Sequence, residues 1–68
     1  MQIGREITFD YTDKNIKVKG WIYMFDEKTC YVVVGRKTKL NSLIIPKNTV
    51  FPFSINHINN LKYQDENT

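Results

Sequence analysis

Apolar and polar residues alternate with a period of two along most of the chain, which is the pattern of β-strands with one buried face. The alternation predicts a first strand over residues 5–11 and a longer second strand over residues 16–25. The polar segment 26–29 then leads into the β-branched run 30–34, which predicts a third strand. The short loop between them predicts a hairpin of the second and third strands.

Two shorter strands are predicted further along the chain. Residues 43–45 and 49–53 are largely apolar, and Pro46-Lys47-Asn48 separates them because proline does not continue a central strand. Residues 35–39 form a basic loop between the third and fourth strands.

The C-terminal part follows a different pattern. Within residues 54–63, Ile55, Ile58 and Leu61 are spaced three apart, which predicts a short helical turn or an ordered tail against the sheet. Residues 64–68 contain two acids and no base, and we expect them to form a loose tail.

The predicted fold is a single all-β domain over residues 1–63, a small five-stranded and strongly bent barrel that is closed or half-open. Closing a sheet removes its exposed edges, and a barrel does so in little sequence. Gly20 lies in the middle of the second strand, where a glycine often marks a bulge or a sharp bend.

Size and composition narrow the possible functions. A chain of 68 residues buries too little surface to be very stable without a disulfide, a bound metal or oligomerisation. Cys30 is the only cysteine, so it forms no internal disulfide, and with His57 alone it cannot complete a four-ligand zinc site. We therefore expect a homo-oligomer, with no metal and no cofactor.

The lone cysteine, the absence of a signal-peptide pattern and apolar runs of at most five residues predict a cytoplasmic protein outside the membrane. The net charge of +3 suits a polyanion or an acidic protein as partner.

The order of features over residues 5–52 resembles two groups of small barrels. These are the Sm-like proteins, especially bacterial Hfq-type RNA chaperones, and the SH3-like barrels, including KOW-type modules. The resemblance rests on Lys17-Val18-Lys19-Gly20, on Phe25-Asp26 followed by residues 30–34, and on residues 43–47 followed by Val50-Phe51. It implies an SH3-like or Sm-like barrel, RNA binding, ring assembly for the Sm-like group, and a basic role for Lys47. The helix that precedes Hfq-type barrels and their basic-His turn have no counterpart here.

The second strand carries the most informative candidate site. Uninterrupted alternation places five residues on one face: Lys17, Lys19, Trp21, Tyr23 and Phe25. Lysines attract the phosphate backbone, and aromatic rings stack unpaired bases. A bulge at Gly20 would instead turn the three aromatic residues into the core, and a second subunit or the segment 55–61 could also cover them.

A second cluster lies in the basic loop, where Arg36, Lys37 and Lys39 fall within four residues. Lys47 is a further candidate, and the group either contacts phosphates or is simply a solvated loop. The chain contains no nucleophile elbow, phosphate-binding glycine loop or paired catalytic carboxylates, so we expect no enzymatic activity. The sequence favours a module that binds single-stranded nucleic acid, RNA more than DNA. The alternative is a protein-interaction module, such as an adaptor, an assembly component or a phage- or plasmid-type inhibitor, that uses the same aromatic face.

Overall fold

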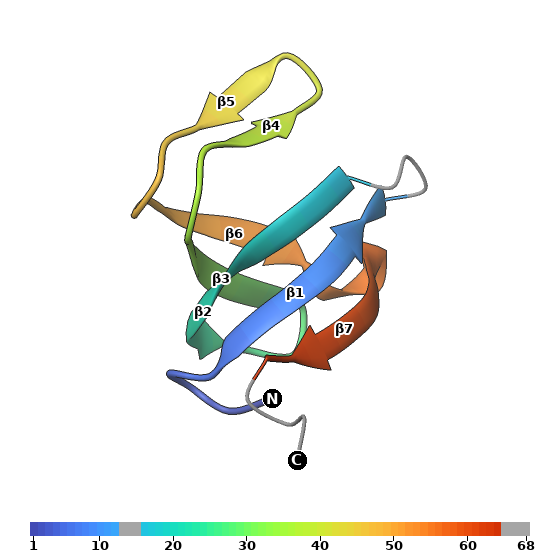
Figure 1. The fold of residues 1–68 in the computed structure, drawn as a ribbon. Coiled ribbons are helices and arrows are strands. Elements are labelled where there is room, and N and C mark those ends of the chain that lie inside the picture. Colours follow the sequence, from blue (N-terminus) through green and yellow to red (C-terminus); the bar gives the residue numbers. More distant parts are fainter. Residues whose placement is uncertain (13–15, 65–68) are drawn as a thin grey trace.

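The computed structural model describes residues 1–12 and 16–64, and within them the chain is built of strands and one 3-10 turn (Figure 1). The strands are β1 (Glu6–Tyr11), β2 (Ile16–Phe25), β3 (Thr29–Val34), β4 (Thr38–Leu40), β5 (Leu43–Ile45), β6 (Val50–Ser54) and β7 (Ile58–Tyr63), and the 3-10 turn is η2 (Ile55–His57). The all-β prediction is confirmed.

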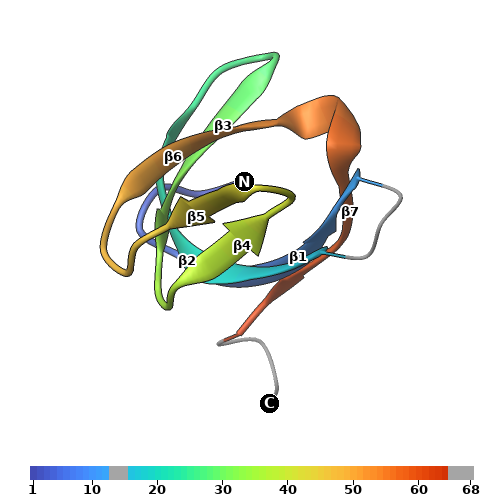
Figure 2. The same cartoon turned by 90° about the horizontal axis from the view of Figure 1, so that it is seen from above.

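Five strands form one antiparallel sheet in the order β6-β3-β2-β1-β7. Seen from above, this sheet curls around its interior, and the β4–β5 hairpin lies over one end (Figure 2). No closed barrel is found: in the described chain β6 pairs with β3, β7 pairs with β1, and the two edges share no ladder. The turn η2 joins these edges and carries the chain around the corner between them.

The concave side of the sheet encloses the core. Its fully buried side chains are Ile7, Phe9, Val18, Ile22, Cys30, Val32, Val34, Ile45 and Phe53. The ring of Phe53 is central, with ring centroids 5.3 Å from Phe9, 4.9 Å from Tyr11 and 5.0 Å from Phe51. Cys30 is fully buried and packs as a small hydrophobic residue, and this burial raises the pKa of its thiol.

Gly20 lies where β2 passes between β1 and β3, opposite Ile7 and Val34. A Cβ atom at this position would lie 2.2 Å from the Val33 carbonyl oxygen, so the close approach of β3 requires a glycine. Burial nevertheless alternates without interruption from Val18 through Gly20 to Ile22. The glycine therefore permits close packing and does not reverse the faces of the strand.

The β2–β3 hairpin is confirmed, and Asp26 orders its turn. The carboxylate of Asp26 accepts hydrogen bonds from the backbone N–H groups of Lys28 and Thr29, both at 2.8 Å. These two donors lower the pKa of Asp26.

Two parts of the chain differ from the sequence prediction. Residues 38–40, expected within or next to a loop, form β4 and pair with β5. Residues 58–63 form the edge strand β7, whereas the helical turn is limited to 55–57. Gln64 lies within the predicted loose tail, yet its backbone N–H donates to the Glu6 carbonyl at 2.9 Å and its side chain donates to Thr8 Oγ1 at 3.0 Å. The rest of the predicted tail, residues 65–68, lies outside the described residues.

Candidate functional site

The outer face of β2 carries four of the five predicted residues. Because Val18, Gly20 and Ile22 point inward, the intervening side chains of Lys17, Lys19, Trp21 and Tyr23 point outward. Trp21 is 40% exposed and Tyr23 is 56% exposed. The buried alternative for these two aromatic residues is therefore wrong within this chain.

Phe25 does not share this face, because the strand has a bulge two residues before it. Ile22 pairs with Val32 and Met24 pairs with Tyr31, so Tyr23 is the extra residue. Phe25 then pairs with the buried Cys30, so it lies on the opposite side of the strand from Met24, and at the end of the strand it is still 38% exposed. Met24, which the sequence analysis did not select, takes the outer position and is 44% exposed.

Trp21 is positioned by the start of the basic loop. The backbone N–H of Gly35 donates to the Lys19 carbonyl at 2.7 Å. A Cβ atom on Gly35 would lie 3.3 Å from Cζ3 of the Trp21 indole, so the ring packs against this glycine. The loop residues Arg36 and Lys37 follow directly, which brings the two predicted clusters together.

The other basic candidates are more dispersed. The backbone N–H of Asn48 donates to the Val34 carbonyl at 2.8 Å, which holds the turn containing Lys47 beside the same loop. Lys39 lies on β4 opposite Ile44, in the hairpin and not on the main sheet. Arg5 lies elsewhere, with its guanidinium carbon 4.2 Å from the centre of the Tyr63 ring.

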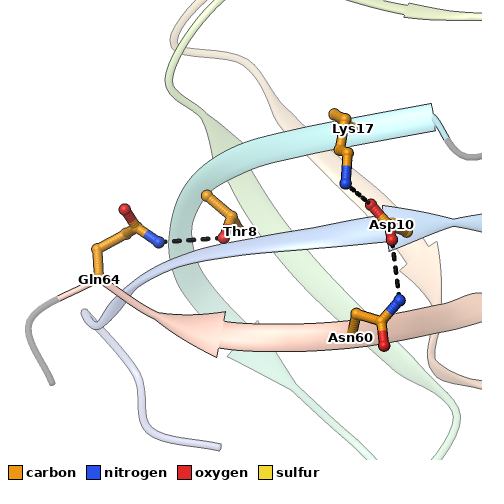
Figure 3. A network of polar contacts seen from close by, with 5 residues as sticks. All are labelled: Thr8, Asp10, Lys17, Asn60 and Gln64. Atoms are coloured by element: carbon orange, nitrogen blue, oxygen red, sulfur yellow. Dashed lines mark hydrogen bonds and ion pairs between the residues drawn. The ribbon is translucent and has the colours of Figure 1, made fainter. Parts of the chain in front are cut away.

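The lysines of β2 face acidic residues on β1. The ammonium of Lys17 lies 2.7 Å from the carboxylate of Asp10, which also accepts a hydrogen bond from the Asn60 side chain at 3.0 Å (Figure 3). These two partners, Lys17 first, lower the pKa of Asp10. The ammonium of Lys19 lies 4.0 Å from the Glu6 carboxylate, at the limit of an ion pair. The positive charge of the β2 face is thus partly neutralised.

A pocket of about 400 Å³ opens beside the Lys17–Asp10 pair. It is lined by Thr8, Phe9, Asp10, Lys17, Val18, Arg36, Asn60 and Lys62. Asn60 and Lys62 are not among the candidate residues from the sequence, because the sequence pattern does not predict β7. These two residues lie beside β1 because β7 pairs with it, and no signal in the sequence indicates that pairing.

The part of the outer face formed by the second half of β2 with β3 and β6 is apolar. We call it the apolar half of the face. Across the sheet, Trp21 pairs with Val33, and Val33 pairs with Val50. Met24 likewise pairs with Tyr31, and Tyr31 with Pro52, so the two rows on β2, β3 and β6 contain no charged residue. Exposed apolar side chains gathered in this way are typical of interaction surfaces.

Comparison of the chain with protein families, with curated proteins and with solved structures finds no match. Over residues 1–12 and 16–64, no three His, Cys, Asp or Glu side chains are grouped so that they could hold a metal ion. The same part of the chain contains no helix long and apolar enough to cross a membrane.

Proposed function

We propose that this protein is a non-catalytic module that binds single-stranded nucleic acid, RNA more than DNA, across the outer face of β2. The observation that carries the proposal is the position of Trp21. Its exposed indole packs against Gly35, between Lys19 on its own strand and the basic loop that contains Arg36 and Lys37.

The mechanism begins with electrostatic capture. The basic side chains attract the phosphate backbone, and Trp21 and Tyr23 then offer ring faces to successive unpaired bases. Residues two apart on a strand are separated by about 7 Å, so neighbouring bases can reach both rings. Stacking carries little base specificity, since every base has a π-face.

Alanine substitutions at Trp21 and at Tyr23 test whether these two rings form the stacking platform. Stacking contributes ~1–3 kcal/mol per base, so we expect Trp21→Ala to weaken binding of a labelled single-stranded RNA by about 5-fold to 150-fold. Tyr23→Ala should weaken it in the same direction. Phe25→Ala is the matched control, because it removes an aromatic ring from the same strand but not from the same face.

Binding is measured by fluorescence anisotropy, and far-UV circular dichroism checks that each variant is folded. Equal affinities for the wild type, Trp21→Ala and Tyr23→Ala would contradict the proposed site.

The apolar half of the face supports a second candidate, a protein contact, which we propose to be with another copy of this chain. Val50 and Pro52 extend the exposed apolar surface from β2 to the edge strand β6, away from the lysines. A folded Val50→Asp variant should dissociate such an oligomer in sedimentation. A wild-type protein that is monomeric at high concentration would exclude this candidate.

The setting that we propose for either activity is a half-open SH3-like or Sm-like barrel in the cytoplasm. The strongly curled sheet supports the barrel, and the buried, unpaired Cys30 supports a reducing compartment.

A further inference from the structure

We propose that the pocket beside Asp10 binds a terminal phosphate of the nucleic-acid strand, so that the protein recognises a phosphorylated strand end. The inference rests on the proposed function and adds the chemical group that fixes the end of the bound strand.

The pocket combines side chains from distant parts of the sequence. Thr8 and Asp10 come from β1, Lys17 from β2, Asn60 and Lys62 from β7, and Arg36 from the loop after β3. Its volume of about 400 Å³ falls within the usual range of small-ligand sites, ~300–1,000 Å³.

The charge of the pocket matches a phosphate monoester. Three cations, Lys17, Arg36 and Lys62, stand against the single carboxylate of Asp10, so the lining carries a net charge of +2. A phosphate monoester carries about −1.5 to −2 at pH 7, whereas an internal phosphodiester carries a single negative charge. The terminal group therefore balances the pocket more fully than an internal one.

The pocket also has hydrogen-bond donors to spare. Lys17 uses one of three ammonium donors on Asp10 and remains well exposed. Asn60 donates one amide N–H to Asp10, which leaves the second. Within the described chain, no carboxylate lies within ion-pair distance of Arg36 or Lys62. Asp10 thus holds Lys17 and Asn60 in place (Figure 3). The remaining donors of these two side chains are available to a phosphate.

The position of the pocket along β2 favours binding of the end of a nucleic-acid strand over binding of its interior. Lys17 and Asp10 form the last but one pair of the β1–β2 ladder. Trp21 lies four residues away along β2, a distance of about 13 Å. An RNA strand whose base stacks on Trp21 and whose backbone passes over Lys19 therefore reaches the pocket at the end of the sheet.

The test compares one RNA sequence with a 5′-phosphate, with a 3′-phosphate and with neither, using anisotropy at low salt. We expect one phosphorylated form to bind about tenfold more tightly, which corresponds to one charge-assisted hydrogen bond. Arg36→Gln and Lys62→Gln should each reduce this preference to about twofold. Lys28→Gln, which removes a charge in the β2–β3 turn at the other end of β2, should leave it unchanged.

The outcomes separate the two proposals. If all three RNAs bind equally, a strand end is not recognised, although the proposed function stands. If none binds, both proposals fail. In a parallel titration with inorganic phosphate, the side-chain amide NMR signals of Asn60 should shift in the wild type and much less in Lys62→Gln. Unmoved Asn60 signals would overturn the pocket as a phosphate site even if the RNAs bind.

Discussion

Replacing Gly20 by alanine should destabilise this protein strongly. The added Cβ would lie 2.2 Å from the Val33 carbonyl oxygen and 2.8 Å from Val32 Cγ1, whereas ordinary contact begins near 3.4 Å. The closest atom belongs to the backbone of a neighbouring strand, so relief requires β2 and β3 to separate by roughly 1 Å. Overpacking of this kind costs about 1–3 kcal/mol, and the smaller entropy of the unfolded alanine chain returns only about 0.4–1 kcal/mol.

Because the clashing atom belongs to the backbone, the overpacking cost lies at the top of this range, and we expect Gly20→Ala to lower the free energy of unfolding by about 2 kcal/mol net. A domain of this size has a total of about 3–10 kcal/mol, so the loss is a large fraction of its stability. The corresponding fall in Tm is about 8–16 °C.

Urea unfolding followed by Trp21 fluorescence and by far-UV circular dichroism measures this difference. Gly35→Ala is the matched control, because its new Cβ would lie 3.3 Å from the movable Trp21 ring and in ordinary contact, at 3.5 Å, with the Lys19 carbonyl oxygen, and should cost less than about 1 kcal/mol. A Gly20→Ala protein within about 0.5 kcal/mol of the wild type, or less affected than Gly35→Ala, would refute the close approach of the two strands.

Three further experiments test the core and the polar network around Asp10. Phe53→Ala removes the ring at the centre of the aromatic cluster and should cost about 3–5 kcal/mol in urea unfolding; a cost below about 1 kcal/mol would contradict the packing described. The pKa of Asp10 lies below its ordinary value of 3.8, so its ion pair stabilises the fold above about pH 4, and this stabilisation disappears as the pH falls through the folded-state pKa. Asp10→Asn should accordingly be less stable than the wild type at pH 7, and the difference should shrink below pH 4; a difference that is constant with pH would contradict this assignment. The Cys30 thiol is buried with a raised pKa, so it should react with a thiol reagent only as fast as the chain opens, and an immediate reaction in native buffer would place it at the surface.

The sequence predicted the strands wherever alternation was regular. This holds for β1 and the first half of β2, while the β-branched run of β3 and the polar turn before it predicted the hairpin. It failed at β7, and the structure shows why. A bulge inserts an extra residue near Asn60, whose φ is +56°, so Ile58 and Leu61 both contact the core at a spacing of three. That spacing suggests a helix in the sequence alone.

The candidate site shows the same limit. The outward direction of Lys17, Lys19 and Trp21 follows from uninterrupted alternation, and the structure agrees with it. Alternation alone could not exclude a reversal at Gly20, and it gave no sign of the bulge at Tyr23 that separates Phe25 from the platform. The polar pocket forms because β7 pairs with β1, and alternation along the chain does not predict which strands pair.

The most direct test of the central claim is a titration of the wild-type protein with single-stranded RNA at low and at physiological salt, following the emission of Trp21, the only tryptophan. We expect a change in Trp21 emission that saturates with RNA, and an affinity that falls as salt rises because counterions are released from the phosphates. An unchanged emission and no binding at low salt would contradict the claim that the outer face of β2 is a nucleic-acid platform.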